Sequence, residues 1–166
     1  MGHHQEYDAR AGDVRRAGHE DAPAIAAVHR DSIRGLAASS YSTAQIEAWL
    51  EGREPERYRR AMDAGEIMFV AELPDGSVVG FGSYQADEVR AVYVAPPHAR
   101  RGLASRILAC IEMHALRQGH SSLWLDASLG AVPFYAARGY ARGEDGTHAL
   151  RGGVELQCVR MTKQIR

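Results

Sequence analysis

Residues 94–105 read VAPPHARRGLAS, and this stretch marks the change from a strand to a helix. An apolar run ends at Pro96 and Pro97, where proline stops a strand. A helical pattern of apolar residues then begins at Leu103, directly after Gly102. The first N–H groups of a helix lack partners, and the helix dipole adds about half a positive charge there. One explanation for the two arginines that precede the glycine is an anion that binds at this point.

A pyrophosphate would suit this helix start. Gly102 lets a ligand approach the backbone closely, and the small side chains of Ala104 and Ser105 keep the next turn open. Arg100 and Arg101 add charge-assisted donors. The alternative is a surface turn with two solvated arginines, and the stretch alone favours neither. The glycine spacing matches neither the phosphate loop of nucleotide hydrolases nor the dinucleotide-binding fingerprint, so both classes are disfavoured.

The flanking segments predict a mixed α/β domain. Helices are predicted over residues 22–36, 44–50 with Thr43 as N-cap, 55–64, 103–117 and 132–138. Strands are predicted over residues 13–17, 67–71, 78–84, 88–94, 123–125 and 154–161. In residues 88–94 the alternation places Val89, Ala91 and Tyr93 on one face of the strand. The expected sheet is mostly antiparallel, with one right-handed strand–helix–strand crossover between parallel strands over residues 88–126.

Length and composition narrow the class of protein. The chain has 166 residues, which suits one domain over residues 13–166 after a flexible segment at 1–12. A formal net charge of -1 argues against broad nucleic-acid binding. No apolar run reaches the roughly 20 residues of a membrane span, and the first residues do not form a signal peptide, so the cytoplasm is expected. Cys110 and Cys158 lie in apolar segments and are expected to be buried, reduced thiols. The histidines and cysteines show no metal-ligand spacing.

Two segments resemble motifs of one enzyme family. The run VYVAPPHARRGLA at residues 92–104 resembles the acyl-CoA-binding motif of the GNAT family of N-acetyltransferases, a strand, a proline, a glycine-containing loop and a helix. The run AVPFYAARGY at residues 131–140 resembles the family's closing motif, in which an aromatic–Tyr pair on a short helix precedes a glycine. With the order of the other elements, the resemblance covers nearly the whole chain from about residue 13. It implies a GNAT-like fold with helices on both faces of the sheet.

The resemblance also implies the activity, in which an acetyl group passes from acetyl-CoA directly to a primary amine. Acetyl-CoA is then the co-substrate, and no metal is expected. The residues implied to hold the coenzyme are Val92, Tyr93, Val94, Arg100, Arg101, Gly102, Leu103, Ala104, Ser105 and Phe134. Two positions depart from the family pattern. Ala99 replaces an Arg or Gln, which leaves the phosphates to backbone amides and Arg100. Ser128 and Gly130 stand where relatives often carry an asparagine that contacts the pantetheine arm.

Glu88 and Tyr135 are the implied catalytic residues. Glu88 lies fourteen residues before Gly102, about where histone-type members of the family carry a general base. Asp87 or Asp126 could serve instead, and a solvated carboxylate at the strand end is the structural alternative. Tyr135 matches the family tyrosine that protonates the coenzyme sulfur; the structural alternative is a packing aromatic side chain. The oxyanion donor is expected to be a backbone N–H near Val94, if the strand bulges there.

The acceptor is expected to bind against the first helices. Tyr41, Trp49, His29 and Arg34 lie in or beside these helices, although Trp49 also fits the core and His29 the surface. No acidic run marks a groove for histone tails, so a small amine is the favoured acceptor. The alternatives are a non-catalytic acyl-CoA sensor and an acetyltransferase of protein lysines or N-termini. No nucleic-acid or membrane partner is expected; because family members are often dimers, a homodimer is among the expectations. The acceptor's identity, the acyl-chain preference and the oligomeric state are not evident from the sequence.

Overall fold

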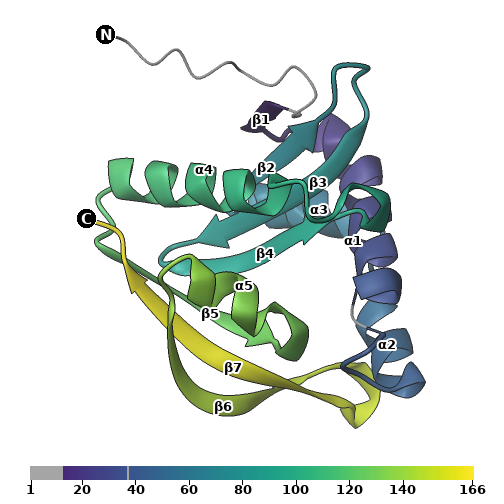
Figure 1. The fold of residues 1–166 in the computed structure, drawn as a ribbon. Helices are drawn as coiled ribbons and strands as arrows, with labels where there is room; N and C mark the ends of the chain where they lie inside the picture. Colours follow the sequence, from purple (N-terminus) through teal and green to yellow (C-terminus); the bar gives the residue numbers. More distant parts are fainter. Residues whose placement is uncertain (1–12, 37) are drawn as a thin grey trace, which may run out of the picture.

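One mixed sheet organises the chain (Figure 1). The computed structural model describes residues 13–36 and 38–166. The seven strands lie in the order β1-β2-β3-β4-β5-β7-β6, and only β4 and β5 are parallel neighbours. The predicted flexible segment, residues 1–12, lies outside the described residues.

The elements follow the predicted order. The strands are β1 (Asp13–Arg16), β2 (Ile67–Glu72), β3 (Val78–Gln85), β4 (Glu88–Val94), β5 (Ser122–Ser128), β6 (Ala141–Ala149) and β7 (Glu155–Gln164). The α-helices are α1 (Ala22–Leu36), α2 (Thr43–Leu50), α3 (Pro55–Asp63), α4 (Leu103–Arg117) and α5 (Val132–Ala137). The mixed, mostly antiparallel sheet and the β4–α4–β5 crossover are thus confirmed.

Two local predictions were wrong or incomplete. Strand β6 was not predicted, because its nine residues are polar or small and all are exposed. The strand forms because it pairs with β7. Its sequence lacks the alternation of apolar and polar residues by which a strand is predicted. The N-cap of α2 is Ser42 and not Thr43. The Ser42 hydroxyl accepts a hydrogen bond from the Gln45 N–H at 3.2 Å, and the Gln45 side chain accepts one from the Ser42 N–H at 2.9 Å, which forms a capping box.

Helices cover both faces of the sheet (Figure 1). On one face, α4 packs Ile107 and Ile111 against the strands, and α5 adds to the same cluster. On the other face, α1 and α3 pack against Val70 and Phe81. The helix α4 lies very close to β3 at Gly82, where a Cβ would come within 2.4 Å of the Ile107 Cγ2 atom. Only glycine fits at this contact.

Strand β4 contains a bulge that re-aims its side chains. Ser83 of β3 pairs with Ala91, and the next residue, Tyr84, pairs with Val89, so Arg90 is the extra residue. Val89 consequently joins the cluster on the α4 face, whereas Ala91 and Tyr93 pack on the α1 face. The predicted alternation, with Val89 on the same face as Ala91 and Tyr93, was therefore wrong. The bulge also lies four residues before Val94.

Strands β4 and β5 pair only at one end. Their single register pair is Glu88 with Trp124, beside a hydrogen bond of 2.9 Å from the Trp124 N–H to the Asp87 carbonyl. Beyond this pair the two strands no longer share a ladder. Side chains from the remainder of both strands instead line a cleft.

Candidate active site

A cleft of about 640 Å³ lies between β4, β5, the start of α4 and α5. The predicted coenzyme residues line it, with the exception of Arg101, which is exposed. Ser128 and Gly130, which replace the asparagine of relatives, also line the cleft. The predicted coenzyme residues thus come from β4, the loop before α4, α4 itself and α5, and the fold places them around one cavity.

The loop before α4 is shaped for close approach by a ligand. Arg100 has a φ of 61°, a left-handed conformation that is uncommon for a residue with a side chain. Gly102 has a φ of 82°, and a Cβ at this position would meet nothing within 4 Å. Gly102 is the N-cap of the 15-residue helix α4, and no side chain caps the first N–H groups. These N–H groups, with Arg100 beside them, fit a bound phosphate.

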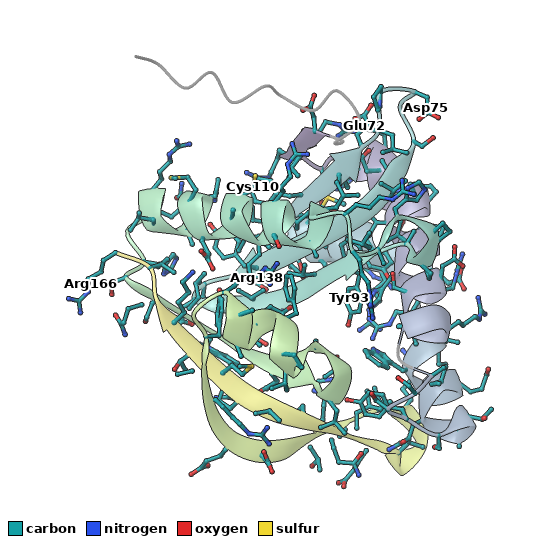
Figure 2. The ribbon with its side chains drawn as sticks, in the orientation of Figure 1. Glu72, Asp75, Tyr93, Cys110, Arg138 and Arg166 are labelled. Carbon is teal, nitrogen blue, oxygen red and sulfur yellow. The ribbon has the colours of Figure 1, made fainter. Side chains whose placement is uncertain are left out.

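Arg138 is a further cation at this end of the cleft that the sequence did not single out. It caps the C-terminus of α5, and its side chain lies between α4 and α5 (Figure 2). Its Nε donates a hydrogen bond of 2.7 Å to the hydroxyl of Ser105 on α4. Its guanidinium lies 4.2 Å from the centre of the Phe134 ring. The contact with Ser105 joins segments that are far apart in the sequence, so no local sequence signal could have identified Arg138.

Tyr135 lines the same cleft from α5. Its ring packs edge-on against Phe134 at 5.0 Å and Tyr140 at 5.6 Å. Burial raises the pKa of its phenol, so the hydroxyl keeps its proton at neutral pH. Among the described residues, no hydrogen bond engages this hydroxyl. A protonated donor thus faces the cleft.

A second cavity, of about 450 Å³, adjoins the cleft. The same residues line both spaces where they meet: Tyr41, Trp49, Val89, Arg90, Ala91, Tyr93, Asp126 and Ser128. The second cavity extends toward α1, α2 and α3, where the acceptor was expected. We call it the acceptor cavity.

The aromatic residues predicted for the acceptor line this cavity. Tyr41 donates a hydrogen bond of 2.7 Å to the Gln157 carbonyl and accepts one of 2.9 Å from the Leu129 N–H. Trp49 packs edge-on against Tyr41 at 5.6 Å. Arg34, in contrast, is exposed and lines neither space.

His29 is buried, and the surface alternative for it is excluded. Only 5% of the residue is exposed, and its ring centre lies 4.3 Å from that of Tyr93. Its Nδ1 lies 2.8 Å from the Tyr58 hydroxyl, whereas its Nε2 has no hydrogen-bond partner in the described part of the chain. Burial lowers the pKa of His29 well below its ordinary value, which makes the imidazole neutral at physiological pH.

The carboxylates predicted as bases occupy different places. Glu88 lines the acceptor cavity, and its Oε2 lies 3.4 Å from the Arg90 Nε. Asp126 lines both spaces and forms an ion pair of 2.6 Å with Arg160. Asp87 lines neither and accepts a hydrogen bond of 3.0 Å from the Trp124 indole. The geometry therefore leaves Glu88 and Asp126 as candidates.

Further charged residues of the acceptor cavity were not identified from the sequence. Glu66, just before β2, accepts a hydrogen bond of 2.6 Å from the buried Ser83 hydroxyl. Arg53 and Arg57 line the cavity from the start of α3 and the residues before it. Charged residues at the surface of short helices are common, so nothing in the local pattern distinguished them.

Within residues 13–36 and 38–166, no three His, Cys, Asp or Glu side chains converge as metal ligands. No helix in this part is long and apolar enough to span a bilayer. Cys158 is buried and Cys110 half-buried, and both are free thiols. The absence of a metal and the cytoplasmic location stay predictions.

Comparison with known proteins gives consistent matches. Residues 37–164 match the family model of the acetyltransferase (GNAT) domain. The uncharacterized N-acetyltransferase YafP of Escherichia coli (strain K12) is 29% identical over 116 residues, which are 70% of this chain and 72% of that protein.

Solved structures agree over most of the chain. A GCN5-related N-acetyltransferase from Rhodopseudomonas palustris is 32% identical, with a TM-score of 0.85 over 92% of this chain and 95% of that one. YncA from Salmonella typhimurium, solved with acetyl-CoA, is 20% identical, with a TM-score of 0.67 over 93% of this chain and 94% of that one. At that identity the second match shows the fold alone.

Proposed function

The chain belongs to the GNAT family of acetyl-CoA-dependent N-acetyltransferases, and on that premise we propose that it transfers the acetyl group directly to the primary amine of a small molecule. The observation that carries the proposal is the junction of the two spaces. A cleft with a phosphate-shaped loop at one end meets a separate cavity at β4 and β5, so two substrates can react there. The coenzyme supplies the acetyl group as a thioester.

The coenzyme is proposed to lie along the cleft. Its pyrophosphate would bind the N–H groups at the start of α4, with Arg100 and Arg138 as cationic partners. The pantetheine arm would follow β4 beyond Glu88, where β5 offers no ladder partner. The β4 backbone toward Val94 can then donate N–H groups to the arm and to the oxyanion that develops on the acetyl carbonyl.

Glu88 is proposed to accept the proton of the acceptor's ammonium, directly or through water. An alkyl ammonium has a pKa of about 10.4, so deprotonation must precede attack at neutral pH. The neutral amine nitrogen then bonds to the acetyl carbon, the carbon–sulfur bond breaks, and a second proton leaves the nitrogen to solvent, so that a neutral amide forms. Tyr135 is proposed to give its proton to the departing thiolate and to regain one from solvent after the reaction. Burial raises the pKa of the phenol, but the thiolate in the same desolvated cleft becomes more basic as well.

The shape of the acceptor cavity favours a small molecule. A volume of about 450 Å³, lined by residues of α1, α2, α3 and the sheet, lies within the usual range for small-ligand pockets. A panel of amines and peptides, assayed for thiol release, tests this proposal. Release with small amines supports it. Release with peptides alone would favour a protein acetyltransferase, and tight acetyl-CoA binding without any release would favour a sensor.

The substitution Arg138→Gln is expected to raise the KM for acetyl-CoA about tenfold and to change kcat little. A charge-assisted hydrogen bond to a phosphate contributes about 1.5–3 kcal/mol, and this contact forms equally in the ground and transition states. Steady-state kinetics with varied acetyl-CoA measures the change. Arg142→Gln, an exposed arginine of β6 outside both spaces, is the control. An unchanged KM in Arg138→Gln would remove Arg138 from the coenzyme site.

The substitution Glu88→Gln is expected to lower kcat/KM about a hundredfold at neutral pH. The loss should shrink as the pH approaches about 10, because the fraction of amine that is already deprotonated rises. A pH–rate profile of the variant beside the parent measures this. Asp126→Asn provides the comparison, since Asp126 lines the same junction. If Asp126→Asn shows the pH-dependent loss and Glu88→Gln does not, Asp126 is the base.

A further inference from the structure

Two arginines of the acceptor cavity have no acidic partner. Arg53 precedes α3, and Arg57 lies in its first turn. Neither lies within 4.0 Å of a carboxylate oxygen among residues 13–36 and 38–166. The nearest acidic residues in sequence are engaged elsewhere: Glu54 lies 3.8 Å from Arg30, and Glu56 lies 3.7 Å from Arg59. Two uncompensated cations thus line one wall of the cavity.

These two cations also lie close enough to affect one another. Burial lowers the pKa of Arg53, and the charge of Arg57 lowers it further. The Arg53 guanidinium nevertheless stays charged at neutral pH, as arginine does in proteins. Arg151 lies near Arg57 but does not line the cavity: a Cβ at Gly52 would come within 3.9 Å of both guanidinium groups. Arg53 is half-buried and Arg57 is exposed, so water screens part of their mutual repulsion, and a bound anion would lower it further.

The acidic groups of the cavity belong to a different wall. Glu88 lies on β4 within the acceptor cavity, Asp126 lies on β5 at the junction with the cleft, and Glu66 lies just before β2. Arg90 lies 3.4 Å from Glu88 and 3.7 Å from Glu66, so the carboxylates already have cationic partners within the protein. Carboxylates at the junction suit the ammonium of the acceptor, and the arginines near α3 suit a negative group.

His29 is a buried polar residue among those that line this cavity. It is 5% exposed, its Nδ1 lies 2.8 Å from the Tyr58 hydroxyl, and its Nε2 is fully buried without a hydrogen-bond partner in the described residues. Burial keeps the imidazole neutral, so His29 adds no positive charge to that of the arginines.

We infer that the acceptor is a primary amine that also carries a carboxylate, which Arg53 and Arg57 bind on the α3 side of the cavity. The inference rests on the proposed function, because the amine end is placed at Glu88 and the coenzyme cleft. The planar guanidinium groups match a carboxylate in geometry as well as in charge. The rings of Tyr58, Tyr93 and His29 enclose the body of the molecule between the two ends.

Matched pairs of amines test the inference. L-amino acids, β-alanine and γ-aminobutyrate are each compared with their own carboxamides in a thiol-release assay. The carboxylate form of the best pair should have a kcat/KM about ten to a hundred times that of its amide. A preference for the amide in every pair would overturn the inference. The three classes of acid also vary the separation between amine and carboxylate.

Variants of the cavity arginines test whether these residues cause the preference for the carboxylate form. Arg57→Gln should lower kcat/KM for the carboxylate form about tenfold and leave that for the amide unchanged, whereas Arg57→Lys should retain part of the preference. Arg60→Gln is the matched control, because Arg60 is exposed on the same helix and lines neither space. Equal losses with both forms in Arg57→Gln would contradict the assignment.

A binding measurement decides the case in which no amine of the panel reacts. The melting temperature of the CoA-bound protein is measured with N-acetyl amino acids and with their amides. A rise with the acids alone, absent in Arg57→Gln, supports the anion site, and the lack of thiol release then counts against the proposed transfer only. No rise with either form, together with no reaction, would overturn the inference.

Discussion

Replacing Tyr135 by Phe is expected to lower kcat about a hundredfold to a thousandfold while the affinity for acetyl-CoA changes little. The substitution removes one oxygen from a side chain that is 7% exposed and faces the coenzyme cleft. The ring and its packing against Phe134 and Tyr140 remain. Only the proposed proton donor for the departing thiolate is lost, and such a donor acts in the transition state and not in the bound ground state.

The control for this prediction is Tyr140→Phe. Tyr140 belongs to the same aromatic cluster, but its hydroxyl donates to Glu112 at 3.1 Å and lines neither the cleft nor the acceptor cavity. This variant should lose some stability and keep its kcat. Steady-state kinetics with titration calorimetry of acetyl-CoA separates turnover from binding. Equal losses of kcat and affinity in Tyr135→Phe would exclude the role as acid.

The second large effect is expected from Gly102→Glu, which should weaken coenzyme binding at least about a hundredfold. The open space beside Gly102 is where the pyrophosphate is proposed to lie, and a carboxylate there would both fill it and repel the phosphates. The parent at a coenzyme concentration of 100 Kd gains about 2.7 kcal/mol of stability, and the variant at the same concentration would gain only about 0.4 kcal/mol. Thermal melting with and without acetyl-CoA measures the difference.

Gly119→Glu provides a matched control at the other end of α4. Gly119 has a φ of +94°, close to the +82° of Gly102, and it too has nothing within 4 Å of its Cβ position. Both variants therefore carry a similar backbone strain and the same added charge. Gly119→Glu should keep its stabilisation by acetyl-CoA. Protection that persists in Gly102→Glu would refute the phosphate site.

The residues proposed to hold the coenzyme, which line one cleft, could be picked out from the sequence because their signals are local. Prolines that end a strand, a glycine at a helix start and an aromatic pair on a short helix each depend on neighbouring residues only. The same holds for the helices and most strands, whose apolar periodicity reports which face is buried. Each signal lies in one contiguous segment, and these segments fold around one cleft. Residues from four elements could therefore be predicted as parts of the same site.

Tyr41, Trp49 and His29 were expected near the acceptor and line its cavity, but other features, among them the arginines of that cavity, could not be predicted, because contacts between distant segments create them. The bulge at Arg90 appears only in the pairing of β4 with β3 and reverses the face on which Val89 lies. Arg53 and Arg57 resemble ordinary surface residues until the fold places them beside His29 and Tyr93. Strand β6, fully exposed and polar, forms only because β7 supplies its partner.

A crystal structure with acetyl-CoA bound would locate the coenzyme in the cleft. We expect the pyrophosphate on the N–H groups at the start of α4 and the coenzyme sulfur within hydrogen-bonding distance of the Tyr135 hydroxyl. The acetyl group should then point into the acceptor cavity between Glu88 and Tyr93. A coenzyme bound outside this cleft, or a sulfur turned away from Tyr135 with its acetyl group closed off from that cavity, would contradict the account.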